Sequence, residues 1–268
     1  MLFKKTFYFY VLTAILIFLT SGCSDISNDD SFTEPDLYKL GEFTDNGLTI
    51  AAYADRLLSV GYNAIYLDLH RSGERLNSAE IEMIPMMHME HHSHASPFER
   101  PALVRDDESG LFTGWAIFTM PGGMMGSWEL QLEISGANGS GTSSTGIIEI
   151  EVEQSNRVKT FMTDSEERYV LTWILPDEPA VGMNDLKVAL HKRESMMSFP
   201  PVLNAEFEFE PWMPSMDHGS SNNTTPVHEA GGFYSGQVNF NMTGDWELRF
   251  DIQIGEQDLG RHVFELDF

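Results

Sequence analysis

The chain has 268 residues, of which 42% are hydrophobic and 21% are charged, so it can bury the cores of one or two globular domains. With 16 basic and 41 acidic residues, its formal net charge is −25. Such a surface repels polyanions, which argues against nucleic acid as a partner, and it attracts cations. Acidity alone more often serves solubility.

The first residues predict export and not folded structure. Lys4 and Lys5 precede an apolar run from Phe7 to Thr20, shorter than the roughly 20 residues that a bilayer span needs. The run ends in "LTSGCS", in which Cys23 is the only cysteine of the chain. This resembles a bacterial lipoprotein signal, in which the cysteine becomes the lipidated first residue. We expect residues 1–22 to be a signal peptide; a plain secretory signal or a short membrane anchor is the alternative.

Residues 23–36 are polar and acidic, and we expect a flexible tether between the lipid and the fold. Their acidity also resembles the surface-export signals of some lipoproteins. The predicted location is therefore the cell envelope, anchored to outer-membrane lipid through Cys23 and facing the periplasm or the cell surface. With no second cysteine, a disulfide or thiolate metal site is excluded.

The rest of the chain repeats itself. "GYNAIYLDLH" at 61–70 matches "GMNDLKVALH" at 182–191, and "GSWELQLEI" later matches "GDWELRFDI" in the same order. The repeat predicts one unit over 37–154 and a second over 156–268.

Within each unit, apolar residues recur at every second position. Trp128, Leu130 and Leu132 share one face of a strand, for example, and their counterparts in the second unit do the same. Short alternating strands separated by Gly, Asn and Ser turns predict an all-β chain. Units of about 110 residues favour two tandem immunoglobulin-like β-sandwich domains after the lipoprotein signal.

Methionine and histidine gather in one inter-strand segment of each unit. The first unit has "IEMIPMMHMEHHSH" at 81–94, and the second has "PWMPSMDHG" at 211–219. Aligning the segments on their acidic residue gives Met-x-x-Met-[Glu/Asp]-His in both. The aligned residues are Met86, Met89, Glu90 and His91 in the first unit and Met213, Met216, Asp217 and His218 in the second.

The second segment and the following "GFYSGQVNFNMTGDWELRFDI" resemble the YtkA-like domain, which is related to FixH-like proteins. From Gly182 to the end, the second unit follows this pattern over most of its length. The first unit departs from it, because His88 replaces a proline and residues are inserted before its tryptophan. The resemblance implies an immunoglobulin-like fold and an extracytoplasmic binding role near copper proteins.

The residue types themselves favour copper. Thioether sulfur is a soft ligand that suits Cu(I), and imidazole suits either oxidation state. We therefore expect Cu(I) in preference to Cu(II). The candidate ligands are Met86, His88, Met89, His91, His92 and His94 in the first unit, and Met213, Met216 and His218 in the second.

Four further residues are weaker candidates. Met120 and Met242 end strands, but the faces they share with phenylalanines favour core packing. His70 and His191 occupy equivalent strand ends, where a solvated side chain is the favoured interpretation.

Enzyme chemistry is not expected, since the chain has no nucleophile-elbow, phosphate-loop or H-E-x-x-H motif. The favoured function is copper buffering, or delivery to a copper-handling protein, by a lipid-anchored protein with two YtkA-like domains. The alternative is a structural or protein-interaction module, whose methionines cover an open end of the sandwich or form an adaptable apolar patch.

Overall fold

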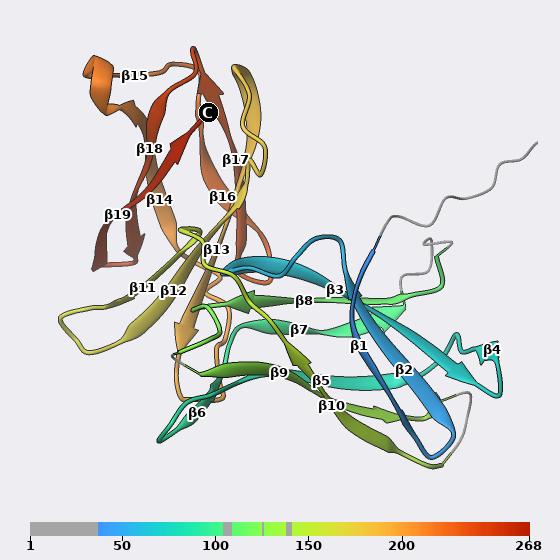
Figure 1. Cartoon of the computed structure of the whole chain (residues 1–268). Coiled ribbons are helices and arrows are strands. Elements are labelled where there is room, and N and C mark those ends of the chain that lie inside the picture. The colour runs from blue at the N-terminus through green and yellow to red at the C-terminus, as the bar shows by residue number, and fades with distance from the viewer. Residues whose placement is uncertain (1–36, 104–108, 125, 138–140) are drawn as a thin grey trace, which may run out of the picture. The chain divides into compact units, whose positions relative to one another are not determined.

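The computed structural model describes residues 37–103, 109–124, 126–137 and 141–268, and residues 34–268 group into one compact unit. Four antiparallel sheets form two sandwich-like domains in this part of the chain (Figure 1). The all-β prediction is therefore confirmed. The predicted signal peptide, Cys23 and the tether lie outside the described residues. No helix among the residues described has the length and apolarity to cross a membrane.

The first sandwich pairs a larger sheet, ordered β1-β2-β3-β8-β7 with β4 added to β3, with a smaller one ordered β10-β9-β5-β6. The strands of the larger sheet are β1 (Tyr38–Asp45), β2 (Leu48–Ala54), β3 (Gly61–Arg71), β4 (Glu74–Arg75), β7 (Phe98–Leu103) and β8 (Phe112–Phe118). Those of the smaller sheet are β5 (Glu80–His88), β6 (Ser93–Ala95), β9 (Ser127–Ser135) and β10 (Ser144–Ile150).

Apart from β4, which has no counterpart, the second sandwich repeats this strand order, with sheets ordered β11-β12-β13-β17-β16 and β19-β18-β14-β15. The larger sheet holds β11 (Val158–Met162), β12 (Arg168–Leu175), β13 (Gly182–Arg193), β16 (Thr224–Ala230) and β17 (Phe233–Phe240). The smaller sheet holds β14 (Glu206–Met213), β15 (His218–Gly219), β18 (Asp245–Ile254) and β19 (Gln257–Asp267), with the short 3-10 helix η2 (Pro214–Met216) between β14 and β15.

The predicted alternation places the apolar side chains between the sheets. Trp128, Leu130 and Leu132 on β9 lie in the first core, and Trp246 and Leu248 on β18 lie in the second. The intervening side chains on β9 and β18 are only half-buried or exposed. Burial of these apolar faces supplies the main driving force for each sandwich.

The same side-chain clamp fixes the start of the central strand in both sandwiches. The Asn63 amide donates to the carbonyl oxygens of Ser59 and Gly61, and its oxygen accepts from the Ser59 N–H. Asn184 makes the three equivalent bonds with Ala180 and Gly182. The quoted "GYN" and "GMN" therefore mark one structural feature.

Both larger sheets end in an edge strand that bulges at a proline. The register of β7 shifts between Glu99 and Ala102, and β16 shifts in the same way around Pro226. The neighbouring strands β8 and β17 carry a glycine at this point. A Cβ on Gly114 would lie 2.7 Å from the Glu99 carbonyl oxygen, and one on Gly236 would be closer still to the opposite backbone.

The two sandwiches share a small apolar cluster. Trp115 and Ile117 on the outer face of β8 pack with Val170 and Ala189 of β12 and β13. Trp115 also meets the Phe233 ring edge-on at 5.3 Å between centroids. Both faces of β8 are therefore covered, and the strand lacks the alternating burial of its neighbour β3.

We expect Gly114→Ala to lower the free energy of unfolding by about 1–3 kcal/mol, because the added methyl group collides with the backbone of β7. Urea denaturation followed by tryptophan fluorescence measures the change. Gly141→Ala is the matched control: no atom of the residues that the structure describes lies within 4 Å of its Cβ position, so its effect should stay below about 0.5 kcal/mol. Equal effects of the two substitutions would contradict the close approach of β7 and β8.

Candidate functional site

The methionines of the first segment lie along β5 and just beyond it. Met87 is fully buried in the first core, and Met89 packs against the same core from the following loop. Met86, on the opposite face of β5, is only 7% exposed. These thioethers are therefore largely packed into the sandwich.

Three histidines of this segment have distinct surroundings. His88 Nε2 lies 2.9 Å from a Glu129 carboxylate oxygen, and its Nδ1 lies 3.0 Å from the Ser93 hydroxyl. The His91 side chain is 83% exposed, and its Nε2 lies 3.8 Å from a Glu90 carboxylate oxygen. His92 is exposed, and its ring stacks with that of His94 at 6.4 Å between centroids.

His94 is the buried histidine of the segment. Its Nδ1 lies 2.8 Å from the Ala95 carbonyl oxygen, an acceptor only, so Nδ1 carries the proton and Nε2 keeps its lone pair. The ring meets Trp128 edge-on at 5.7 Å. Burial lowers the pKa of His94, which favours the neutral imidazole that binds metals.

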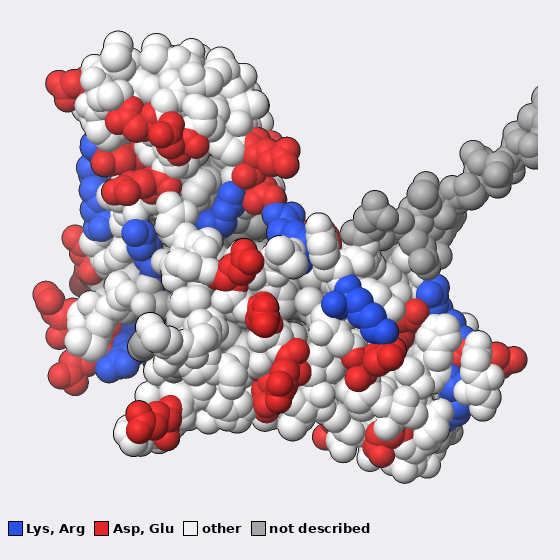
Figure 2. Space-filling view, in the orientation of Figure 1, with Lys and Arg blue, Asp and Glu red and all other residues white. Residues whose placement is uncertain are grey.

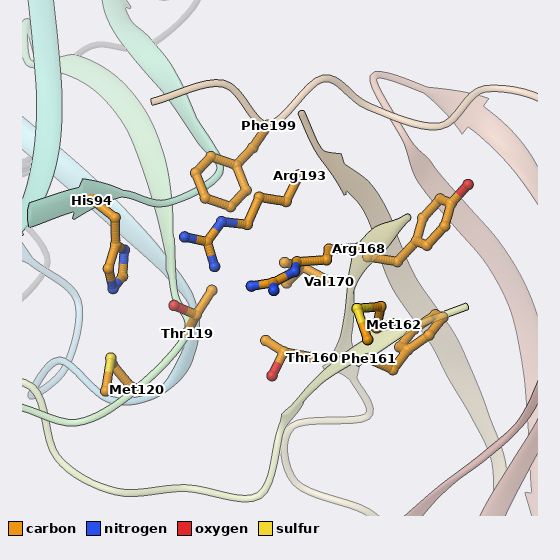
Figure 3. A pocket seen from close by; sticks show the side chains of 11 residues that line it. His94, Thr119, Met120, Thr160, Phe161, Met162, Arg168, Val170, Arg193 and Phe199 are labelled. Atoms are coloured by element: carbon orange, nitrogen blue, oxygen red, sulfur yellow. The ribbon is translucent and has the colours of Figure 1, made fainter. Parts of the chain in front are cut away.

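Met120 is tied to the same tryptophan. Trp128 Nε1 donates to the Met120 carbonyl oxygen at 2.9 Å, which fixes the backbone just after β8. The partly buried Met120 side chain and His94 line one hollow and lie on the same side of it in Figure 3. The first sandwich thus joins a histidine, a methionine and a buried tryptophan from three separate stretches of chain.

The second sandwich has the same arrangement. His218 Nδ1 lies 2.9 Å from the Gly219 carbonyl oxygen, and its ring meets Trp246 edge-on at 6.4 Å. Trp246 Nε1 donates to the Met242 carbonyl oxygen at 3.0 Å. The Met242 side chain is 37% exposed, so this set is more open than the first.

The other two methionines of the second segment are separated by burial. Met213 ends β14 inside the second core, whereas η2 carries Met216 outward to 57% exposure. The Ser215 N–H donates to an Asp245 carboxylate oxygen at 3.1 Å, which ties η2 to the start of β18. Met216 is thus an exposed thioether on an anchored turn.

The structure corrects the sequence alignment of the two segments. His94 pairs with Met87 across β5 and β6, as His218 pairs with Met213 across β14 and β15. The counterpart of His218 is therefore His94, and not His91, and Met87 takes the place assigned to Met86. The spacing explains the error: seven positions separate residues 87 and 94, but five separate 213 and 218.

A glycine confirms this equivalence. A Cβ on Gly126 would approach the Met87 methyl carbon at 3.0 Å, and a Cβ on Gly244 would approach that of Met213 at 2.6 Å. Both glycines lie two residues before the buried tryptophan and have positive φ angles of 146° and 134°. Each glycine therefore admits a methionine against the tryptophan strand.

The two strand-end histidines have opposite environments, and neither lies in these sets. His70 Nε2 lies 2.9 Å from an Asp68 carboxylate oxygen and is part-exposed. His191 is 2% exposed in the contact between the sandwiches, 5.8 Å from the Trp115 ring. Its Nδ1 is buried without a hydrogen-bond partner.

Acidic side chains surround each tryptophan. A hollow of about 550 Å³ beside Trp128 is lined by Glu149, Glu151 and Glu153. Its counterpart beside Trp246 measures about 690 Å³, and its lining includes five acidic residues, one arginine (Arg157) and several neutral side chains. Figure 2 shows Asp and Glu spread over the visible face, with Lys and Arg in smaller groups.

The sequence predicts only a core role for Trp128 and Trp246. It does not reveal that each indole also contacts a histidine ring and donates a hydrogen bond to a methionine carbonyl. The available signal was a histidine followed by a small residue in both segments, "HA" and "HG", upstream of the matching "GSW" and "GDW". Among the residues described, no group of three or more His, Cys, Asp or Glu side chains is placed to hold a metal ion.

The fold and these sets define an all-β protein of two sandwiches. Residues 164–251, less than half of the chain, match the family model described as YtkA-like. This range contains Met213, Met216, His218, Met242 and Trp246. The protein is thus a β-sandwich protein that contains a YtkA-like domain.

Solved structures similar to the chain include the FdeC adhesin of Escherichia coli, with 10% identity, a TM-score of 0.27 and coverage of 85% of this chain and 65% of that one. Invasin, a bacterial integrin-binding protein, shows 13% identity, a TM-score of 0.26 and coverage of 82% and 39%. A conserved domain protein from Bacillus anthracis shows 8% identity, a TM-score of 0.32 and coverage of 90% and 92%. The chain thus spans less than two thirds of the first two. No curated protein matches the chain.

Burial lowers the pKa of His191 to about 4, whereas the pKa of a histidine in the unfolded chain is about 6.5. Between these values the unfolded state binds a proton that the folded state does not, so stability falls as the pH drops from about 6.5 to 4. Between pH 7 and pH 4.5, we expect wild type to lose about 2–3 kcal/mol more free energy of unfolding than the His191→Phe variant loses.

Urea denaturation at the two pH values measures this difference. His228→Phe is the control, because His228 is exposed and its loss should leave the pH dependence of wild type. If the His191 variant loses as much stability as wild type, the histidine does not stay neutral in the folded protein.

Proposed function

We propose that this chain is a lipid-anchored cell-envelope protein that binds copper, with one site in each sandwich. One observation carries the proposal: a histidine with its Nδ1 engaged by a carbonyl, a buried tryptophan and a methionine recur in the same geometry. The first set is His94, Trp128 and Met120. The second is His218, Trp246 and Met242.

The donor chemistry supports Cu(I). A thioether and a neutral imidazole are uncharged donors of the kind that this ion accepts, whereas Ca²⁺ and Mg²⁺ select carboxylate and carbonyl oxygen. His94 and His218 each have Nε2 available, because Nδ1 is held by the next residue's carbonyl. The neighbouring indole shields one side of the site from water. Met87 and Met213 lie across the strand pair from His94 and His218 and are the additional thioethers beside each set.

The charge of the chain supports a cationic cargo. Acidic side chains are among the residues that line the hollows beside Trp128 and Trp246, and Arg157 is the one basic residue in either lining. Such a field raises the local concentration of cations at the open ends of the sandwiches. These acidic side chains therefore attract cations to the tryptophan end of each sandwich, and the softer donors select the ion. The hollow that His94 and Met120 line differs, because it has no Asp or Glu and holds Arg168 and Arg193.

The exposed thioethers favour exchange over permanent storage. Met216 and Met242 both reach solvent, so a second protein with a soft ligand can approach a bound ion. This supports buffering, or delivery to a copper-handling protein in the envelope, with Cys23 holding the chain to outer-membrane lipid. We assign the first sandwich the same YtkA-like character because its topology is the same. The proposed role is binding and not catalysis.

We expect the purified protein to retain one Cu(I) per sandwich under reducing conditions against a chromogenic Cu(I) chelator. His218→Ala with Met242→Ala should abolish one site, and His94→Ala with Met120→Ala should abolish the other, because each pair supplies both soft donors. Metal analysis after desalting and chelator competition measure occupancy and affinity.

A matched control removes the same residue types elsewhere. His228→Ala with Met197→Ala changes an exposed histidine and an exposed methionine and should leave both sites intact. A fourfold variant combines the alanine substitutions at His94, Met120, His218 and Met242. The copper proposal fails if wild type and the control retain no more copper than this fourfold variant.

A second function is favoured by one observation. Val181, Met183, Met216 and Met242 are all exposed, and Gly182 pairs with Phe240, so β13 begins where β17 ends. Exposed methionines form adaptable apolar contacts, which supports a protein-interaction role at this end of the second sandwich. Wild-type protein without copper retention favours this function.

A further inference from the structure

Two arginines stand opposite each other on the larger sheet of the second sandwich. Arg168 on β12 and Arg193 on β13 are cross-strand partners, a placement that is destabilising for like charges. Neither guanidinium forms an ion pair with a carboxylate among the residues described. The nearby Glu166, Glu167 and Glu194 line a second hollow with both arginines. In a chain with 41 acidic residues against 16 basic ones, two opposed arginines without a direct ion pair are unexpected.

Both side chains enter one hollow of about 420 Å³. Figure 3 shows the two guanidinium groups converging inside it. No Asp or Glu lines this hollow, in contrast to those beside the tryptophans. Burial and the neighbouring Arg168 both lower the pKa of Arg193, as expected when two cations share a partly enclosed space.

The remaining walls are apolar or weakly polar. Phe161, Val170 and Phe199 supply carbon surface, and Thr119 and Thr160 add hydroxyl groups. Arg193 lies 5.9 Å from the Phe199 ring centroid and touches the Met196 sulfur. These contacts orient the guanidinium without neutralising it, so its positive charge remains available to a ligand.

We propose that this hollow binds a small organic carboxylate, with the carboxylate held between Arg168 and Arg193 and its apolar body against Phe161 and Phe199. Guanidinium groups bind carboxylates through paired, charge-assisted hydrogen bonds. The volume is in the range of small-molecule sites. The carbon walls favour an anion that carries an aromatic or aliphatic body over a fully hydrated inorganic one.

Such a ligand touches both sandwiches. His94, Thr119 and Met120 belong to the first, and the arginines belong to the second. A bound carboxylate therefore offsets the positive charge that faces His94 and adds contacts across the junction. His94 and Met120 line this hollow as well, but the arginines and phenylalanines that would hold the carboxylate are not proposed copper ligands. Copper retention and benzoate binding to the metal-free protein are measured separately, so either proposal can fail without the other.

Benzoate is the probe, titrated into the full-length metal-free protein by calorimetry at low salt. We expect submillimolar binding, weakened about tenfold or more by Arg168→Gln or by Arg193→Gln, since each removes one charge-assisted pair. Arg261→Gln is the control. Arg261 forms an ion pair with Asp251, and both residues lie on the smaller sheet of the second sandwich, away from Arg168 and Arg193. Its substitution should therefore change the affinity for benzoate less than twofold.

Arg168→Lys keeps the positive charge and so separates loss of the charge from loss of folding. We expect this variant to bind benzoate more weakly than wild type and more tightly than Arg168→Gln. Thermal melts of each variant, with and without benzoate, provide a second readout. Absence of benzoate binding by wild type overturns the proposal. Equal affinity for inorganic phosphate, or unchanged binding in both glutamine variants, overturns it as well.

Discussion

The interaction on which each candidate site depends is the hydrogen bond from a buried tryptophan to a methionine carbonyl. An indole N–H inside a core needs an acceptor, because an unpaired buried donor is costly. Trp128 and Trp246 find theirs in the backbone of Met120 and Met242. The bond fixes the chain after β8 and β17, while the indole edge supports a histidine. Core packing and site geometry therefore have the same origin.

The two sandwiches place this shared arrangement in different surroundings. In the first, the hollow beside His94 is walled by Arg168 and Arg193 of the second sandwich. In the second, Met242 and η2 carry their thioethers into solvent. One topology thus yields an enclosed set and an open set within one compact unit. The difference comes from the apolar contact through Trp115 and Ile117.

The period of two in the sequence was sufficient to predict the fold and the inward faces, because β9 and β18 each have one face in a core. It could not reveal the contact at Ile117, since a strand buried on both faces has no alternation to read. The alignment of the two methionine and histidine segments wrongly matched His91 with His218. The first segment is longer by two residues, which shifts any alignment based on a single acidic position. Arg168 and Arg193 escaped notice because 25 positions separate them in the sequence, and only the β12–β13 register brings them together.

The proline bulges of β7 and β16 have a consequence for neighbouring molecules. Free strand edges recruit other chains by continuing the sheet, and proline interrupts the row of N–H donors that such growth requires. Pro101 and Pro226 occupy this position on the outermost strand of each larger sheet. Two copies of the chain that meet along these edges therefore do not continue one another's sheets and separate as independent molecules.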